Sequence, residues 1–262
     1  MAATRSPFDD RVYIVTGSTQ GVGAAMALAL ARAGARALVI CGRNRDGGAS
    51  VKSAIEAAGA AAEYVRADLS QEADCRAVTD ACDKRFGRLD GLVNAAGDTT
   101  RGSIETTPVE TWDRLFAINV RAPFILMQDG IKLMRREHLA GTIINIITQS
   151  SYGGQPFITA YCASKGALVA LTKNVANAVR KDRIRVNGVN LGWTDTPNER
   201  KARIAQGYPE DWLAKAEAEQ PFGRLIKPED VARLGLFLLG PDSGIMTGAV
   251  IDFSQRVMGA WD

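Results

Sequence analysis

Short apolar runs alternate with helix-forming stretches along most of this chain. Six runs, at residues 12–15, 37–41, 62–65, 89–93, 142–147 and 184–189, predict strands. Residues 23–33, 49–58, 72–86, 112–134 and 161–179 have a helical bias. Strands that are apolar on both faces and alternate with helices are typical of a parallel sheet covered on both sides by crossover helices. The sequence therefore predicts an α/β protein with a doubly wound parallel sheet.

The composition indicates one ordinary globular domain. No Pro/Ser-rich linker, charge block or repeat divides the 262 residues, so we expect a single domain over residues 1–262. A net charge of +3 and scattered arginines argue against nucleic acid as a partner. We expect no signal peptide, because no continuous apolar stretch follows the first positive charge, and no apolar run of about 18 residues could span a membrane. One histidine and four cysteines without a CxxC pair predict no metal site and a cytoplasmic location.

The segment at residues 196–222 interrupts the alternation. It contains three prolines, many charged residues and the exposed-looking aromatic side chains Tyr208 and Trp212. In an α/β sheet, ligands bind beyond the carboxyl ends of the strands, so an insertion after the sixth strand is placed to fold over such a site. We expect this segment to cover a substrate; a surface excursion without a role is the alternative.

A glycine-rich sequence joins the first predicted strand to the first predicted helix. It reads TGSTQGVG at residues 16–23. Gly17 would allow a sharp turn, Gly21 a close approach to a pyrophosphate, and Gly23 tight packing of the helix on the strand. Free N–H groups at the helix N-terminus would face the anion. We therefore expect a Rossmann-type dinucleotide site formed by Gly17, Ser18, Thr19, Gln20, Gly21, Val22 and Gly23.

The end of the second predicted strand bears on which dinucleotide is bound. An acidic side chain there would bind the free ribose 2′-hydroxyl of NAD, but the sequence CGRNR at residues 41–45 has none. Arg43 could instead pair with a 2′-phosphate. NADP(H) is therefore favoured and NAD(H) stays possible, because Asp46 is close and Arg43 could be a solvated loop charge.

Tyr161 and Lys165 lie four residues apart in the sequence YCASK, and so on one face of a helix. A nearby cation favours the phenolate and lowers the pKa of a tyrosine toward values useful for general acid-base catalysis. Because such a pair also arises by chance, its weight comes from its position behind a glycine-rich turn.

Taken together, TGSTQGVG, the sequence NAAG at residues 94–97, Asn119 and YCASK occur in an order that resembles the short-chain dehydrogenase/reductase family, in its compact single-domain branch. The resemblance extends from about residue 12 to residue 252. It implies an NAD(P)-dependent oxidoreductase that interconverts a secondary alcohol and a ketone by hydride transfer.

The resemblance also implies roles for individual residues. Tyr161 is the expected acid or base at the substrate oxygen, and Lys165 is expected to bind the nicotinamide ribose and to lower the Tyr161 pKa. Asn119 is expected to hold a helix distortion and a water of the proton relay. Cofactor contacts are implied for Asn119, Tyr161 and Lys165 and for Asp68, Leu69, Asn94, Ala95, Ala96, Gly97, Gly192, Thr194 and Thr196.

The chain departs from the family pattern at three places. Thr148 occupies the position of the substrate-orienting serine; it keeps a hydroxyl but adds a methyl group. Ser150 and Ser151 are nearby alternatives that the spacing disfavours. A leucine precedes Gly192 where the family has proline, and the late DGG reads DFS at residues 252–254.

Other functions and the substrate stay open at this level. A nucleotide-binding regulator or scaffold that lost turnover is the main alternative, and an epimerase or dehydratase of nucleotide sugars is a third hypothesis. Polar residues at 148–155 with Tyr208, Trp212 and Trp193 would suit a polyol, sugar or hydroxylated ring, whereas Phe157 and Ile158 would suit an apolar ketone. By resemblance we expect a homo-oligomer, a dimer or tetramer, that acts on a small carbonyl or alcohol.

Overall fold

Seven parallel strands form one sheet in the order β3-β2-β1-β4-β5-β6-β7. The structure is a computed structural model that describes residues 6–257 and 260. The strands are β1 (Val12–Val15), β2 (Ala37–Gly42), β3 (Ala61–Arg66), β4 (Gly91–Asn94), β5 (Thr142–Thr148), β6 (Arg185–Leu191) and β7 (Val250–Phe253). The α-helices are α1 (Gly21–Arg32), α2 (Arg45–Ala57), α3 (Glu72–Phe86), α4 (Val109–Phe116), α5 (Ala122–Arg136), α6 (Thr159–Val179), α7 (Pro197–Ala205), α8 (Trp212–Ala218) and α9 (Pro228–Leu239). Short helical turns are η1 (Ala117–Arg121), η2 (Gln149–Tyr152), η3 (Arg180–Asp182) and η4 (Pro241–Ser243).

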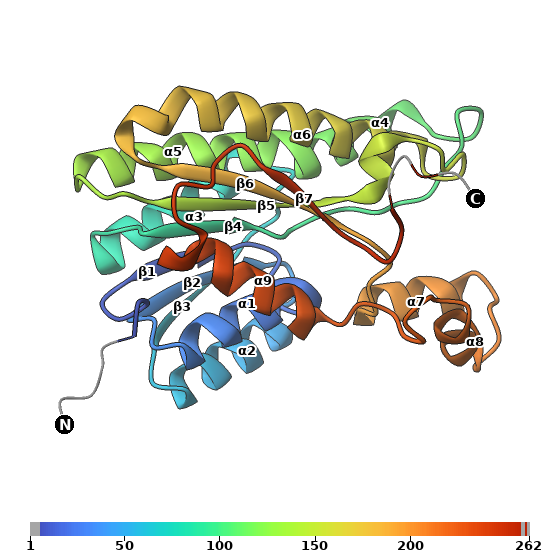
Figure 1. The fold of residues 1–262 in the computed structure, drawn as a ribbon, viewed down its shortest axis with the longest axis horizontal. Helices are drawn as coiled ribbons and strands as arrows, with labels where there is room; N and C mark the ends of the chain where they lie inside the picture. Colours follow the sequence, from blue (N-terminus) through green and yellow to red (C-terminus); the bar gives the residue numbers. More distant parts are fainter. Residues whose placement is uncertain (1–5, 258–259, 261–262) are drawn as a thin grey trace.

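Helices cover both faces of the sheet, as the continuous apolar strands predicted. In β1, Tyr13 and Val15 pack in the apolar cluster that includes α1, α2 and α9, while Val12 and Ile14 pack in the cluster that includes α3, α5 and α6. Figure 1 shows these two layers of helices on either side of the strands. The predicted fold class, a Rossmann-type doubly wound α/β sheet, is confirmed.

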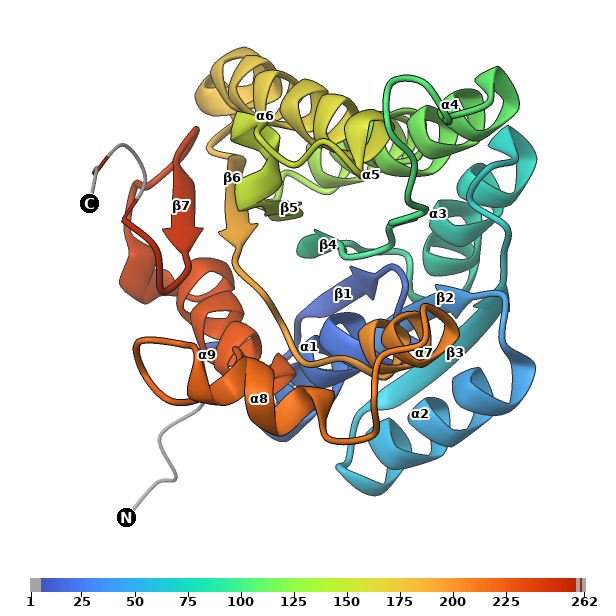
Figure 2. The ribbon, with the colours of Figure 1, turned by 90° about the vertical axis from the view of Figure 1, so that its right-hand side faces the viewer.

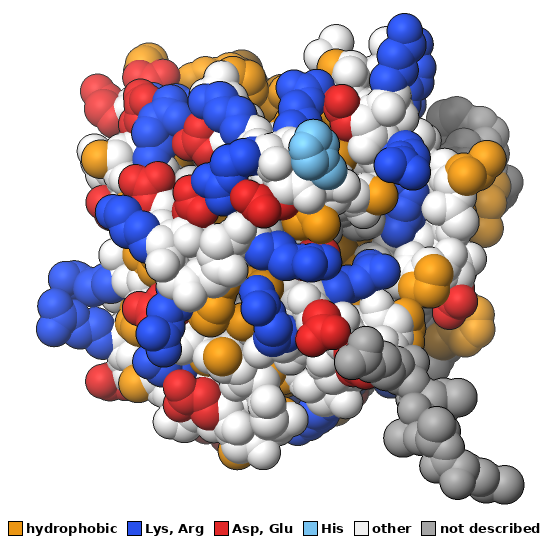
Figure 3. Space-filling model, turned by 90° about the vertical axis from the view of Figure 1, so that its left-hand side faces the viewer, with side chains coloured by type: hydrophobic (Ala, Val, Ile, Leu, Met, Phe, Trp, Pro, Cys, Tyr) orange, Lys and Arg blue, Asp and Glu red, His pale blue; other side chains and the backbone are white. Residues whose placement is uncertain are grey.

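The strand order reverses between β1 and β4, which are neighbours in the middle of the sheet. In open α/β sheets, ligands bind beyond the carboxyl ends of the strands at this reversal. Figure 2 looks onto these carboxyl ends, and α7 and α8 lie beyond them in both ribbon views. The opposite end, seen in Figure 3, has Lys and Arg side chains interspersed with Asp and Glu. The geometry therefore directs the search for a site to the edge near α7 and α8.

The predicted helix at residues 112–134 is in fact three successive pieces, α4, the π-helical turn η1 and α5. The spacing of apolar residues did not reveal these three pieces, because a π-helical turn contains only about one residue more than an α-helical turn. The strand β7 was missed altogether. It has four residues that are all at least partly exposed and include Asp252, so it lacks the buried apolar run of the other strands.

The segment at residues 196–222 folds as α7 and α8, joined to β6 by residues 192–196. The prediction that Trp212 is exposed is wrong, since only 6% of this residue is accessible. It packs with Trp193, Ala216 and Leu225 in a small apolar cluster of its own. Proline and charge content marked only an interruption of the alternation, and a short buried core orders the segment as two helices. Within the described ranges, no helix has both the length and the apolar character needed to cross a membrane.

A chain of buried amides and hydroxyls attaches α6 to the centre of the sheet. Asn94 Nδ2 donates to Asn145 Oδ1 (2.8 Å), and Asn145 Nδ2 donates to Thr172 Oγ1 (2.9 Å). All three residues are buried. Because a buried polar group that loses its partner destabilises the fold, this chain favours one register of α6 on β4 and β5. That register places the first turns of α6 at the carboxyl edge of the sheet.

Candidate active site

The four predicted catalytic residues come from different elements that meet at the carboxyl edge. Tyr161 and Lys165 lie in the first turns of α6, Thr148 ends β5, and Asn119 lies in η1 between α4 and α5. Their convergence depends on the order of the strands, because β4 and β5 are adjacent and the helices that follow them pack side by side.

Asn119 is buried at the centre of the π-helical turn, so a helix distortion is present at this residue. Its Oδ1 accepts from the Asp98 backbone N–H (2.9 Å), and its Nδ2 donates to the Asp98 carbonyl oxygen (2.9 Å). Nδ2 also donates to Ser164 Oγ (3.0 Å) in α6. The amide therefore joins the turn after β4 to the helix that carries Tyr161.

The Asp98 side chain also helps to hold the turn after β4 in place. Its carboxylate accepts from Thr100 N–H (2.8 Å) and from Arg114 Nε (3.0 Å). Burial acts in the opposite direction, but these hydrogen bonds prevail and hold the pKa of Asp98 below its usual range. Sequence reasoning missed Asp98 and Ser164; the position of Asp98 directly after NAAG was the available signal.

The Lys165 side chain is almost fully enclosed, with 3% of the residue exposed. Its Nζ donates to the Ile146 carbonyl oxygen (2.7 Å) and lies 5.8 Å from the centre of the Tyr161 ring. Burial lowers its pKa from an ordinary 10.5 to about 8, because removing an ammonium from water disfavours the charged form. The carbonyl of β5 therefore fixes the position of this cation near the phenol.

Burial raises the pKa of Tyr161 above its ordinary value, and a hydrogen bond with Thr148 acts in the opposite direction. The lowering predicted from Lys165 is not seen in this arrangement, because the ammonium points to the Ile146 carbonyl. The phenol is therefore in its neutral form, which carries the proton to be donated. The raised pKa also makes it a weaker acid, an effect that a cation directed at the phenol oxygen would offset.

Thr148 is the hydroxyl that lies beside Tyr161. Its Oγ1 donates to the Leu191 carbonyl oxygen (3.3 Å) and accepts from the Ser150 N–H (3.3 Å). The alternative serines have other partners, since Ser150 Oγ donates to Gln155 and Ser151 Oγ to Asn190 Oδ1 (3.3 Å). The residue chosen by spacing is therefore the one that the fold brings to the phenol.

The glycine-rich turn after β1 has the geometry expected of it. Gly17 and Gly21 have φ values of +61° and +58°, a region in which side chains are strained. A Cβ at Gly17 would lie 2.6 Å from Ala96 Cα, and one at Gly23 would lie 2.5 Å from the Gly17 carbonyl oxygen. These close approaches require glycine. The turn is also tied to β4, because Thr16 Oγ1 accepts from the N–H groups of Ala95 and Ala96.

Some predicted cofactor residues have side chains that face the interior. Ser18 Oγ donates to the Val15 carbonyl (2.7 Å) and accepts from Cys41 N–H (3.0 Å), and the Ser18 N–H donates to the Cys41 carbonyl (3.1 Å), so Ser18 positions the turn and does not offer its N–H to a phosphate. The Asn94 side chain points to Asn145, and the Leu69 side chain lies in the apolar core. Their contribution to a nucleotide site would be through the backbone or through positioning.

Other predicted cofactor residues surround a space kept open by missing side chains. A Cβ at Gly97 would lie 3.7 Å from Lys165 Nζ and 3.5 Å from Asn119 Oδ1, so its absence leaves these polar atoms approachable. A Cβ at Gly21 would face Thr196 Cγ2 at 3.5 Å. The described residues therefore fit a nucleotide that extends from the β1 turn to Lys165. Thr19, Gln20, Val22, Gly192 and Thr194 also lie at this carboxyl edge.

Arg43 follows β2 at the same edge and is exposed. Within the described part of the chain, no ion pair is found for its guanidinium. Asp68 follows β3 and accepts from Ser70 N–H (3.0 Å). Asp46 lies in the first turn of α2, where it complements the helix dipole.

The segment at residues 196–222 is held by one arginine among three aromatic rings. The Arg203 guanidinium carbon lies 4.7 Å from the ring centres of Trp193 and Tyr208 and 5.9 Å from that of Trp212. Glu199 Oε1 accepts from Arg203 Nε (2.8 Å) and from Trp193 Nε1 (3.0 Å). These contacts order α7 and α8 near the site.

Comparison with known proteins identifies the group to which this site belongs. The family described as "Enoyl-(Acyl carrier protein) reductase" matches residues 17–254, which include the glycine-rich turn and the Tyr161 helix. The chain belongs to the short-chain dehydrogenase/reductase family. As a short-chain dehydrogenase/reductase, it is an enzyme of the NAD(P)-dependent oxidoreductase class.

Three relatives show the range of this similarity. "Inactive 2-(S)-hydroxypropyl-CoM dehydrogenase 2" of Xanthobacter autotrophicus is 38% identical over 86% of this chain and 96% of its own. "Cis-4-hydroxycyclohexanecarboxylate dehydrogenase" of Sinomonas cyclohexanicum is 33% identical over 93% and 95%. The structure of L-sorbose reductase from Gluconobacter frateurii, complexed with NADPH and L-sorbose, has a TM-score of 0.91 and 25% identity, covering 98% of this chain and all (100%) of that one.

We expect the stability of the wild-type protein, relative to Lys165→Met, to increase as the pH rises from about 8 to 10.5. The folded lysine releases its proton near pH 8, whereas the unfolded chain holds it to 10.5. The unfolded state then binds more protons in this window, so raising the pH favours the folded state. The full change is about 3 kcal/mol. Urea unfolding of both proteins across this window measures it; a constant difference would contradict the burial of the ammonium.

Proposed function

We propose that this protein interconverts a secondary alcohol and a ketone with NADP(H), in the cytoplasm, on a small-molecule substrate. The observation that carries the proposal is the convergence of a protonated phenol at Tyr161, a buried ammonium at Lys165 and the Thr148 hydroxyl. NADP(H), when bound, would supply or accept the hydride at the substrate carbon. The four cysteines carry free thiols, which suits a reducing compartment.

Tyr161 is the proposed acid and base. In the reduction, its phenol donates a proton to the carbonyl oxygen as that oxygen gains negative charge, and in the oxidation the phenolate accepts the hydroxyl proton. Thr148 donates to the same substrate oxygen and orients it. Lys165 holds the ribose hydroxyls and, while it is charged, stabilises the phenolate. Asn119 keeps the turn after β4 and the Tyr161 helix in register. As the family resemblance implies, it would also hold a water through which the proton reaches solvent.

The cofactor is proposed to lie along the carboxyl edge. The turn at residues 17–23 would hold the pyrophosphate, Asp68 and the Leu69 backbone the adenine, and the turn at residues 94–97 the ribose. Gly192, Thr194 and Thr196 would meet the nicotinamide carboxamide or phosphate. Arg43 would pair with the 2′-phosphate, which is why we propose NADP(H) over NAD(H). The NADPH-bound L-sorbose reductase supports a nicotinamide cofactor of this kind.

A scaffold without turnover is the second candidate. Threonine in place of the family serine motivates it, as does the relative named inactive, with which this chain shares 38% identity. NADPH binding without turnover on any carbonyl compound would support this candidate.

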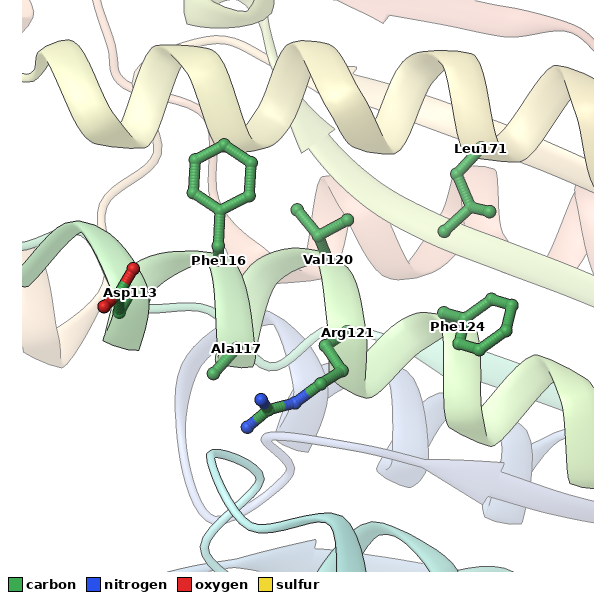
Figure 4. A pocket seen from close by; sticks show the side chains of 7 residues that line it. All are labelled: Asp113, Phe116, Ala117, Val120, Arg121, Phe124 and Leu171. Atoms are coloured by element: carbon green, nitrogen blue, oxygen red, sulfur yellow. The ribbon is translucent and has the colours of Figure 1, made fainter.

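We also propose a homo-oligomer, a dimer or tetramer, that associates through α4, η1, α5 and α6. A hollow of about 600 Å³ on these helices is lined by Phe116, Val120, Phe124 and Leu171, as Figure 4 shows. Asp113 and Arg121 lie at its margin with opposite charges. In a two-fold pairing the same helix of each subunit runs antiparallel to its partner, so these charges meet across the interface.

Tyr161→Phe should lower kcat by at least about a hundredfold, because it removes the proton donor without changing the ring. NADPH oxidation across a panel of ketones measures it. Tyr152→Phe is the matched control, since the Tyr152 hydroxyl bonds to Asp252 and has no proposed role in catalysis. Undiminished turnover in Tyr161→Phe would remove the proposed role of Tyr161.

Arg43→Ala should lower kcat/KM for NADPH by about tenfold or more and leave that for NADH nearly unchanged, because only the 2′-phosphate loses a charged partner. Arg45→Ala is the matched control in the same turn. An equal preference for the two cofactors in wild type and in Arg43→Ala would remove the argument from this arginine.

Phe124→Asp should dissociate the oligomer, because a carboxylate would be desolvated in an apolar interface. Phe124 is 46% exposed in one subunit, so the change should not unfold it. Sedimentation velocity measures the mass of both proteins. A monomeric wild-type protein would contradict the proposed assembly.

A further inference from the structure

A small polar hollow of about 70 Å³ is connected to Thr148 by hydrogen bonds. Thr148 Oγ1 donates to Ser150 Oγ (3.5 Å), which donates to Gln155, a residue that lines the hollow. Its polar and aromatic walls include Gln149, Gln155, Trp193, Gln220, Gln255 and Arg256. None of the described residues that line it is acidic. A hollow of this size has room for about two water-sized groups.

Two of these glutamines are oriented by neighbouring serines. Ser254 Oγ donates to Gln149 Oε1 (2.6 Å), and Ser150 Oγ donates to Gln155 Oε1 (2.6 Å). Ser254 Oγ in turn accepts from the Arg256 N–H (3.1 Å), which leaves its proton for the glutamine. Each amide oxygen therefore accepts one hydrogen bond from a serine, and both N–H groups of each amide remain for a ligand.

The remaining polar groups of the hollow add positive charge and one acceptor. Within the described ranges, no ion pair or hydrogen bond is found for the exposed guanidinium of Arg256. Gln255 is occupied at both ends, since Oε1 accepts from Phe222 N–H (2.9 Å) and Nε2 donates to the Arg224 carbonyl (2.6 Å). Gln220 Nε2 donates one hydrogen bond to the Ala216 carbonyl (3.2 Å), so Gln220 offers its oxygen and its second N–H.

Hydrogen-bond donors therefore outnumber acceptors around this hollow. The Arg256 guanidinium adds a positive charge to its wall, and the hollow has the size of a carboxylate group. We infer that this hollow binds the carboxylate of a hydroxy-acid or oxo-acid substrate whose reacting carbon lies at Tyr161. The inference rests on the proposed function and names its substrate class. In the oxidation, the hydroxyl proton would pass to the Tyr161 phenolate and from there to solvent, and bound NADP⁺ would accept the hydride. The hydroxy acid and NADP⁺ would thus give the oxo acid, NADPH and one proton in solution. The carboxylate is unchanged, and Gln149, Gln155 and Arg256 determine specificity.

The test compares oxo acids with their methyl esters, which keep the shape of the acid and lose its charge. Acetoacetate, 4-oxopentanoate and 5-oxohexanoate place the carboxylate at increasing distances from the ketone. We expect at least one acid to exceed its ester by about tenfold or more in kcat/KM, mainly through KM, because charge-assisted hydrogen bonds form only with the acid.

Gln149→Glu and Gln155→Glu keep the side-chain shape and replace the NH₂ donors by a negatively charged acceptor. Each should lower kcat/KM for the preferred acid by about tenfold or more and leave that for its ester within about twofold. Arg256→Gln should act in the same direction. Gln128→Glu is the matched control, since Gln128 is exposed on α5 outside the hollow and should change neither value.

The outcomes separate the two proposals. The carboxylate subsite would be overturned if esters react as well as their acids and if neither Gln149→Glu nor Gln155→Glu changes the ratio of kcat/KM for acid to that for ester. The proposed oxidoreduction would then still stand. No turnover of any acid, ester or polyol would overturn both. Isothermal titration of the preferred acid and its ester, with NADP⁺ present, should show the same preference in binding, and equal affinity would count against the subsite.

Discussion

The burial of both faces of a parallel sheet is the constraint on which this structure depends. Residues of β1 that alternate along the chain belong to two separate apolar clusters, so helices exclude solvent from both faces of this strand. Because all seven strands are parallel, their carboxyl ends share one edge. The polar residues that follow β1, β4, β5 and β6 therefore meet there, and helices α7 and α8 lie beyond the same edge.

Polar groups inside the protein determine how accurately that edge is assembled. The chain from Asn94 through Asn145 to Thr172 fixes α6 on the sheet, and Asn119 joins the same helix to the turn after β4. Each hydrogen bond contributes about 1 kcal/mol, but leaving one of these buried groups unpaired costs more. The fold thus penalises any shift of the helix that carries Tyr161 and Lys165.

Sequence reasoning succeeded where local chemistry decides the outcome. The glycines at 17, 21 and 23 were predicted from the turn that they must make, and their φ values and close contacts agree. Spacing selected Thr148 over Ser150, and the structure brings Thr148 to the phenol. It failed for Trp212, which a small local core buries, and for β7, whose partly exposed residues gave no apolar run.

The sequence by itself determined the fold class and the family, because apolar runs, glycines and the YCASK spacing report on local geometry. Only the tertiary structure decided the environment of each side chain. The Lys165 ammonium contacts a carbonyl of β5, burial raises the pKa of Tyr161, and serines from different elements orient Gln149 and Gln155. These properties depend on solvent exclusion and on partners that are distant in the chain. A linear pattern of residues does not specify either of them.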